Sequence, residues 1–113
     1  MLTIDILRES GADVDSGLAR CMGMEDFYLN LVGKALQDNS FTVLKEKIDA
    51  KDLDGAFEAA HALKGVLGNL SLEPMYSTVC EITSLLRARS DVDYAPYLKT
   101  LDDQKAVLDK EIG

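Results

Sequence analysis

The sequence predicts an all-α protein, and three observations support this fold class. The chain has only 2 prolines and 6% aromatic residues, with few β-branched runs, which favours helix over sheet. Apolar residues recur three and four positions apart along most of its length. Short groups of turn and capping residues separate these periodic segments. Together they predict an antiparallel up-down-up-down four-helix bundle with short extra N-terminal helices, in which residues 1–113 form a single domain.

Two short helices are expected first. Thr3 is suited to cap a helix that runs to about Arg8, and Gly11 ends it. Asp13 or Asp15 caps a second helix over residues 16–22. Isolated helices of this length are not stable in water. We therefore expect both to pack across one end of the bundle.

Two helices, separated at Asn39 and Ser40, are expected next. Residues 24–38 have acids in their first turn, where they interact favourably with the helix dipole. Asn39 then ends this helix, and Ser40 caps the next, which runs to about residue 51. The positions expected to face the core are Met24, Tyr28, Leu31, Val32, Ala35, Phe41, Leu44 and Ile48.

Three further helices complete the expected bundle. Asp52 or Asp54 begins a long helix that runs to about Leu70. Pro74 is tolerated in the first turn of the next, which reaches about residue 89. The last starts near Tyr94, after a polar connection. Its core positions and those of the preceding helix are Met75, Val79, Ile82, Leu86, Tyr94, Leu98, Leu101, Leu108 and Ile112, with Lys105 interrupting the last stripe.

His61 is the only histidine, and it lies midway along the expected long helix. With about 100° of rotation per residue and His61 placed at 0°, the apolar side chains of this helix fall between roughly 140° and 260° around its axis. The imidazole therefore points away from the core, toward solvent or a partner. The residues that share its face are Asp54, Phe57, Glu58, Lys64, Gly65 and Gly68.

This face is suited to nucleophilic chemistry on a docked partner. An exposed neutral imidazole is a good nucleophile at neutral pH, and Lys64, at i+3, can neutralise an anionic group that the ring carries. Gly65 and Gly68 each cost roughly 1 kcal/mol in a helix interior, and one reason to keep them is clearance for a second macromolecule. Phe57 adds an apolar ring, as docking surfaces do. Mid-helix glycines also serve helix–helix packing, which we expect of Gly33.

The segment Ala60-His61-x-Leu63-Lys64-Gly65, followed by a small residue at Gly68 and an apolar one at Leu70, resembles the histidine-containing phosphotransfer (HPt) domains of bacterial phosphorelays. The resemblance implies a helical bundle in which His61 is phosphorylated on the ring nitrogen distal to the backbone. It implies that Lys64 contacts the phosphoryl group and that Gly65 and Gly68 allow a receiver domain to dock. One position departs from the pattern, because this chain has Ser71 where the family often has a glycine that closes the helix.

Charge and cysteine content exclude some classes of partner. The net charge of −8, from 12 basic and 20 acidic residues, argues against nucleic acid and anionic membrane surfaces as partners. Because the acidic residues are spread along the chain, they favour a soluble monomer. Cys21 and Cys80 lack CxxC spacing and indicate reduced thiols of a cytoplasmic protein. No apolar run approaches the length of a membrane span.

Other chemistry finds little support in the sequence. Asp54 and Glu58 with one histidine are a weak metal-ligand set. Because a P-loop and the kinase signature motifs are absent, we expect neither an ATP site nor a cofactor of the chain's own. Mg²⁺ is expected on a partner receiver domain instead. The chain is accordingly expected to be a phosphocarrier and not an enzyme.

Two hypotheses of different classes follow. In the first, His61 accepts a phosphoryl group from a receiver aspartate or a kinase and passes it to another receiver, with Phe57, Glu58, Gly65 and Gly68 forming the docking surface. Response-regulator receivers and a hybrid sensor kinase are then the partners. In the second, a helical adaptor binds a signalling partner through Phe57, His61 and Gly68 without phosphotransfer. An acid-labile, base-stable label separates the two. A phosphotransfer part of a larger kinase would change the context and not the chemistry.

Overall fold

The computed structural model describes residues 1–112, which form seven helices and no strand. The all-α prediction is confirmed. The helices are α1 (Ile4–Glu9), α2 (Val14–Arg20), α3 (Glu25–Leu36), α4 (Ser40–Asp49), α5 (Leu53–Asn69), α6 (Glu73–Arg87) and α7 (Ala95–Asp109).

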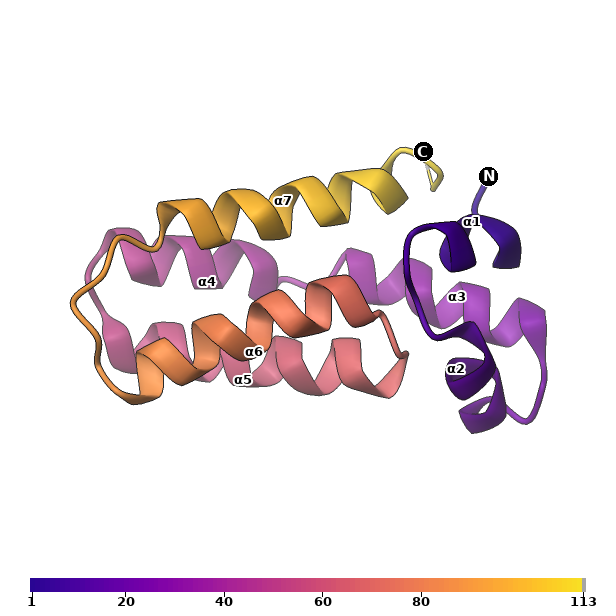
Figure 1. Ribbon diagram of the computed structural model, residues 1–113, viewed down its shortest axis with the longest axis horizontal. Coiled ribbons are helices and arrows are strands. Elements are labelled where there is room, and N and C mark those ends of the chain that lie inside the picture. Colours follow the sequence, from indigo (N-terminus) through magenta and orange to yellow (C-terminus); the bar gives the residue numbers. More distant parts are fainter. Residues whose placement is uncertain (113) are drawn as a thin grey trace.

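Four rods of alternating direction make up the bundle (Figure 1). The first rod is interrupted: α3 and α4 follow one another in the same direction, and α5, α6 and α7 then alternate. At the interruption the Ser40 N–H donates to the carboxylate of Asp38 at 2.8 Å. The prediction that Ser40 caps α4 was wrong, because Ser40 is already the first helical residue and the acid two positions earlier supplies the acceptor.

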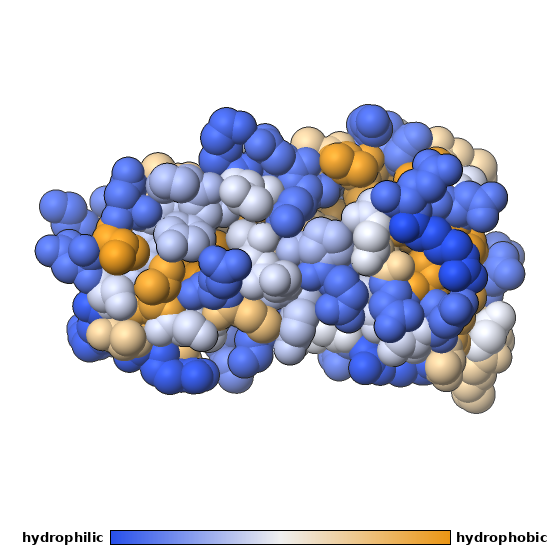
Figure 2. Space-filling view, viewed as in Figure 1, coloured by the Kyte–Doolittle hydropathy of each residue, from blue (hydrophilic) through white to orange (hydrophobic). Residues whose placement is uncertain are grey.

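One hydrophobic core runs through the bundle and continues under the N-terminal helices. The expected stripe of α6 is buried throughout, as are Leu101 and Leu108 of α7. Met24 is an exception, since half of its surface remains exposed just before α3 begins. Other predicted core positions, including Leu31, Ile48 and Leu98, are partly buried at the margin of the core. Charged and polar residues cover much of the face in Figure 2, with apolar patches between them.

The N-terminal helices pack at one end of the bundle, as predicted (Figure 1). The Thr3 hydroxyl accepts from the Ile6 N–H, and the Asp13 carboxylate accepts from the Ser16 N–H. Asp13, and not Asp15, is therefore the cap of α2, which begins two residues earlier than expected. Gly17 is buried against the ring of Tyr28, so α2 can approach α3 closely.

The end of α5 has the hydrogen bonds of a Schellman motif. Leu72 N–H donates to the Leu67 carbonyl at 3.0 Å, and Ser71 N–H donates to the Gly68 carbonyl at 3.1 Å. Ser71 occupies the left-handed region with φ +56°, the conformation that glycine adopts most easily. The departure from the family pattern is thus a serine in a glycine-like conformation. The helix still ends where the sequence predicted.

None of the helices within residues 1–112 combines the length and apolar character that crossing a bilayer requires.

Candidate functional site

His61 lies midway along α5, and its side chain is exposed. The opposite side of the helix carries Ala56, Ala60 and Leu63, none of which has any exposed surface. The helical periodicity therefore placed the imidazole correctly. Asp52 starts this helix by accepting from the Gly55 N–H at 3.0 Å, which confirms one of the two predicted caps.

An open depression of about 460 Å³ lies beside the imidazole. It brings together four residues that the sequence predicted for the site: His61, Lys64, Gly65 and Gly68. Its other walls include side chains from outside α5, which periodicity could not have found. These are Arg20 at the end of α2 and Glu73 and Tyr76 in α6.

The glycines of this region differ in what surrounds them. A Cβ added to Gly65 would meet nothing within 4 Å, so the backbone is open to solvent there. A Cβ on Gly68 would lie 2.9 Å from the ring of Tyr76. The clearance that the sequence suggested for a partner at Gly68 is thus occupied by a side chain of α6. Gly33 has open space as well, so the expected helix–helix packing role is wrong.

A comparison with protein-family models gives a match to the Hpt domain over residues 28–111. This span covers most of the chain, including all of the bundle's long helices from α4 to α7. The chain belongs to the Hpt domain family. No curated protein and no solved structure matched in the two other comparisons.

Hpt domains act in histidine phosphotransfer in two-component systems, as phosphocarriers and not as catalysts. Receiver domains and kinases of these systems are their general partners. The matched span begins at Tyr28, so α1 and α2 precede it.

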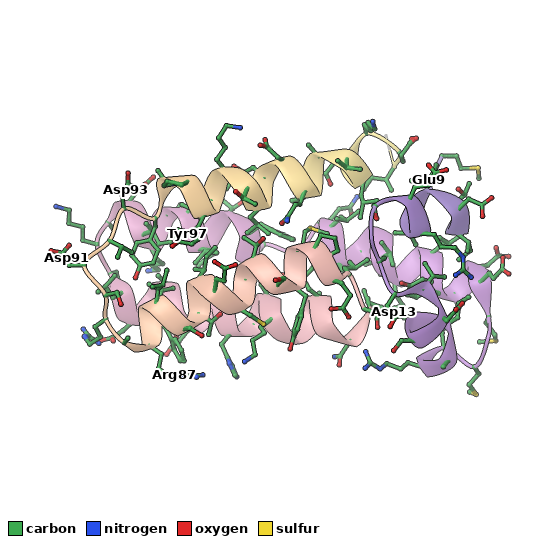
Figure 3. The ribbon with its side chains drawn as sticks, viewed as in Figure 1. Glu9, Asp13, Arg87, Asp91, Asp93 and Tyr97 are labelled. Carbon is green, nitrogen blue, oxygen red and sulfur yellow. The ribbon has the colours of Figure 1, made fainter. Side chains whose placement is uncertain are left out.

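Phe57 of the Hpt domain stacks on His61. The two ring centroids are 6.0 Å apart and the ring planes differ by 18°. Arg87, the last residue of α6, places its guanidinium carbon 5.5 Å from the centroid of the Phe57 ring. The Arg87 side chain points away from the bundle (Figure 3). Phe57 is half-buried and packs against the core, so it is less available for docking than the sequence suggested. Its ring instead lies alongside the imidazole.

The acidic residues near His61 have separate surroundings. Glu58 is exposed, and Asp54 pairs with Arg89, which follows the C-terminal end of α6. No cluster of three or more histidine, cysteine or acidic side chains suited to a metal ion occurs in residues 1–112.

Tyr76 contributes a phenol to the depression. A hydrogen bond with the Cys80 thiol, together with the charges of Cys80 and Glu73, raises the pKa of Tyr76. The phenol therefore stays neutral near pH 7 and can donate or accept hydrogen bonds there. Cys80 is half-buried and Cys21 is buried, and both are free thiols.

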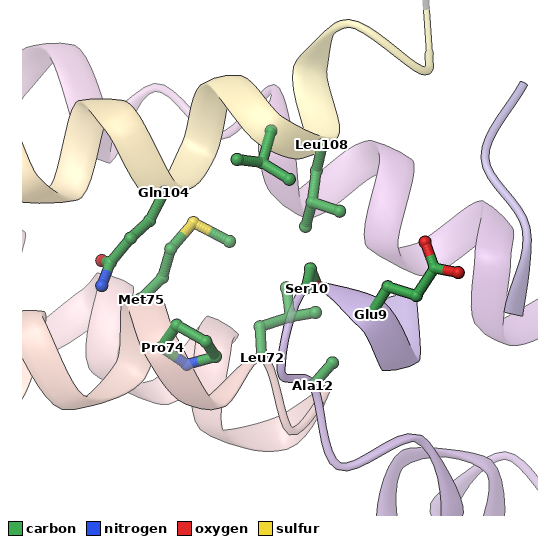
Figure 4. Close-up of a pocket in the computed structure, with 9 residues that line it drawn as sticks. Glu9, Ser10, Ala12, Leu72, Pro74, Met75, Gln104 and Leu108 are labelled. Carbon is green, nitrogen blue, oxygen red and sulfur yellow. The ribbon is translucent and has the colours of Figure 1, made fainter. Parts of the chain in front are cut away.

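A second, smaller pocket lies between the α1–α2 connection and the facing ends of α6 and α7 (Figure 4). Its volume is about 250 Å³, and its walls include Leu72, Met75 and Leu108. None of the predicted site residues lines it. Because His61, Lys64, Gly65 and Gly68 all line the depression beside the imidazole, that depression is the candidate site of this Hpt domain.

Proposed function

We propose that this Hpt domain is a phosphorelay intermediate that carries a phosphoryl group on His61. The observation that carries the proposal is the exposed imidazole on α5, the sole histidine of a chain in this family. The adjoining depression gives a partner access to the ring from the side on which Lys64 and Gly65 lie.

The transfer step needs little from the Hpt domain itself. The imidazole nitrogen distal to the backbone attacks the phosphorus of a receiver's aspartyl phosphate. A nitrogen–phosphorus bond forms, the bond from phosphorus to the aspartate oxygen breaks, and the carboxylate leaves with the electron pair. The other ring nitrogen keeps its proton. The reverse reaction with a second receiver returns the histidine to its neutral form.

Neighbouring residues position and stabilise the transferred group. Lys64 lies one turn after His61 and lines the same depression, where its ammonium can form charge-assisted hydrogen bonds to phosphoryl oxygens. Open backbone at Gly65 lets the receiver's backbone approach the ring. Phe57 holds the imidazole by stacking. Mg²⁺ chemistry would belong to the receiver, whose carboxylates suit that ion.

The test is labelling followed by mapping. The wild-type chain is incubated with a panel of receiver domains carrying labelled phosphoaspartate, and the modified residue is identified. We expect an acid-labile, base-stable label on His61, and no label in His61→Gln with an unchanged circular dichroism spectrum. A label that persists in the glutamine variant would contradict the proposal. Receiver binding without any label would favour an adaptor.

A further inference from the structure

The N-terminal helices close the C-terminal end of α5. Three carbonyls at this end accept hydrogen bonds from residues that precede or begin the bundle. The Tyr28 hydroxyl donates to Leu70 at 2.7 Å, and the Asp13 N–H donates to Ser71 at 2.9 Å. Arg20 Nη1 donates to Gly68. The Gly68 carbonyl also accepts from the Ser71 N–H, and Leu70 and Ser71 directly follow α5. The three bonds therefore hold the N-terminal segments against this end of α5, with α2 beside the candidate site.

Arg20 is placed by this closure at the rim of the depression. Its Nη1 also lies 3.4 Å from the Ser71 hydroxyl, and both bonds use the same nitrogen. A guanidinium has five N–H donors, and the Arg20 side chain is exposed and lines the depression. The bonds to Gly68 and Ser71 therefore leave the donors on Nε and Nη2 for a docked protein.

The distance from His61 separates Arg20 from the chemical step. Gly68, which Arg20 binds, is seven residues beyond His61, or about 10 Å along the helix axis. A phosphoryl group on the imidazole is within reach of Lys64 but not of a group two turns away. A protein interface of ordinary size, roughly 800 Å² per partner, covers both positions.

The positive charges in the depression favour contact with acidic groups of a docked partner. The chain has a net charge of −8, so attraction to a receiver must come from cations close to the interface. Lys64 and Arg20 supply two in the depression, against the single acid Glu73. Glu58 is exposed nearby on α5, and Arg87 lies on the other side of the histidine, against Phe57. A receiver site that holds Mg²⁺ presents several carboxylates.

We infer that Arg20 binds a carboxylate of the receiver domain docked over His61 and sets the affinity of docking, not the rate of transfer. The inference rests on the proposed function of His61. Arg20 precedes the span that matches the family, so its role comes from this structure alone. It makes α2 part of the docking surface.

Three variants test this role. Arg20→Gln keeps an N–H donor for the Gly68 carbonyl but removes the charge, and Arg20→Lys keeps the charge. Arg8→Gln removes a similar charge from the N-terminal helices, away from the depression, where Arg8 pairs with Asp15. Single-turnover transfer is measured at increasing concentrations of the chain with the receiver that labels the wild type fastest. We expect Arg20→Gln to raise the concentration for half-maximal transfer rate about threefold or more, with the maximal rate constant unchanged. Arg20→Lys and Arg8→Gln should stay within twofold of wild type, and added salt should raise the half-maximal concentration less in Arg20→Gln.

The controls separate docking from folding and from chemistry. Phosphoramidate, a small donor that needs no docking, should label His61 in Arg20→Gln as fast as in wild type. An unchanged half-maximal concentration in Arg20→Gln, a lowered maximal rate constant, or equal losses in Arg20→Gln and Arg20→Lys would overturn the role assigned to Arg20. Absence of label on the wild-type chain with every receiver would instead refute the function proposed for His61.

Discussion

Lys64 is half-buried and lies one turn from the sole histidine, which sets it apart from the other lysines of this Hpt domain. In the proposed function, its ammonium would stabilise a phosphoryl group on His61 without taking part in bond formation. Its loss should therefore affect how fast the group arrives and how long it stays.

Lys64→Ala is expected to slow phosphoryl transfer from a receiver, or to shorten the lifetime of the phosphohistidine, by about tenfold. This corresponds to about 1.4 kcal/mol, in the range of one hydrogen bond to a charged group. Single-turnover labelling and decay of the purified phosphoprotein measure the two effects. Lys34→Ala removes an exposed lysine from the last turn of α3 and serves as the control. Wild-type behaviour of Lys64→Ala in both assays would remove its proposed role.

Gly65 and Gly33 form a matched pair, because both lie within helices and both have open space where a Cβ would stand. Replacing either with alanine should raise the free energy of unfolding by about 0.5–1 kcal/mol through helix propensity. Only Gly65 lies beside His61 in the depression. We therefore expect Gly65→Ala alone to slow transfer from a receiver severalfold.

Urea unfolding and receiver labelling of the two alanine variants check this prediction. A Gly65→Ala variant that is more stable and transfers at the wild-type rate would show that the open backbone serves no docking purpose. Loss of transfer in Gly33→Ala would show that the two positions are not equivalent controls.

At the scale of the element, α5 combines a regular interior with a strained end. Ser71, just after α5, adopts φ +56° and has only 2% of its surface exposed. A left-handed conformation costs a residue with a Cβ roughly 1 kcal/mol or more. The hydroxyl offsets part of this by accepting from Arg20 at the long distance of 3.4 Å.

Ser71→Gly is expected to raise the free energy of unfolding by about 0.5 kcal/mol, because relief of the left-handed strain exceeds the loss of a long hydrogen bond. Ser71→Ala is the matched control: it loses the same hydroxyl but keeps the Cβ, and should be less stable than wild type. Thermal and urea unfolding measure both. If the two variants were equally destabilised, the hydroxyl and not the backbone would dominate at this position.

The features that the sequence predicted correctly are those that depend on one helix alone. The direction of His61 follows from the apolar positions of α5, and the caps at Thr3 and Asp52 follow from residue type at a boundary. The orientation of an amphipathic helix is fixed locally, because its stripe must face the core wherever the neighbours lie. This is why the imidazole, Lys64 and Gly65 could be placed beforehand.

Contacts between distant segments could not be predicted in this way. Arg20 is 48 residues from the carbonyl that it binds, and Tyr76 covers Gly68 from another helix. The cation over Phe57 comes from Arg87, thirty residues later in the chain. The spacing of apolar residues within one helix carries no information about which side chain of another helix will contact its surface.

At the scale of the whole molecule, Tyr28 joins the N-terminal helices to the bundle. Its ring has no exposed surface and packs against Gly17 of α2, and its hydroxyl donates to the Leu70 carbonyl after α5. Burial raises the pKa of Tyr28 to about 12, and the nearby Cys21 and Asp13 add to the rise. Below pH 10 the phenol is neutral in both the folded and the unfolded chain, so its contribution to stability is complete there.

Tyr28→Phe should test this contribution through its pH dependence. Between pH 10 and 12 the unfolded wild-type chain ionises at residue 28 while the folded chain does not, so its free energy of unfolding falls by up to about 2.7 kcal/mol. The variant lacks this loss. At pH 8 we expect it to be about 1–2 kcal/mol less stable than wild type, because the Leu70 carbonyl loses its partner. This deficit should shrink to zero or reverse by pH 12, while the lysines titrate alike in both proteins. Urea unfolding of the two chains at each pH measures the difference, and a deficit that stays constant from pH 8 to 12 would mean that the phenol is not held neutral by burial.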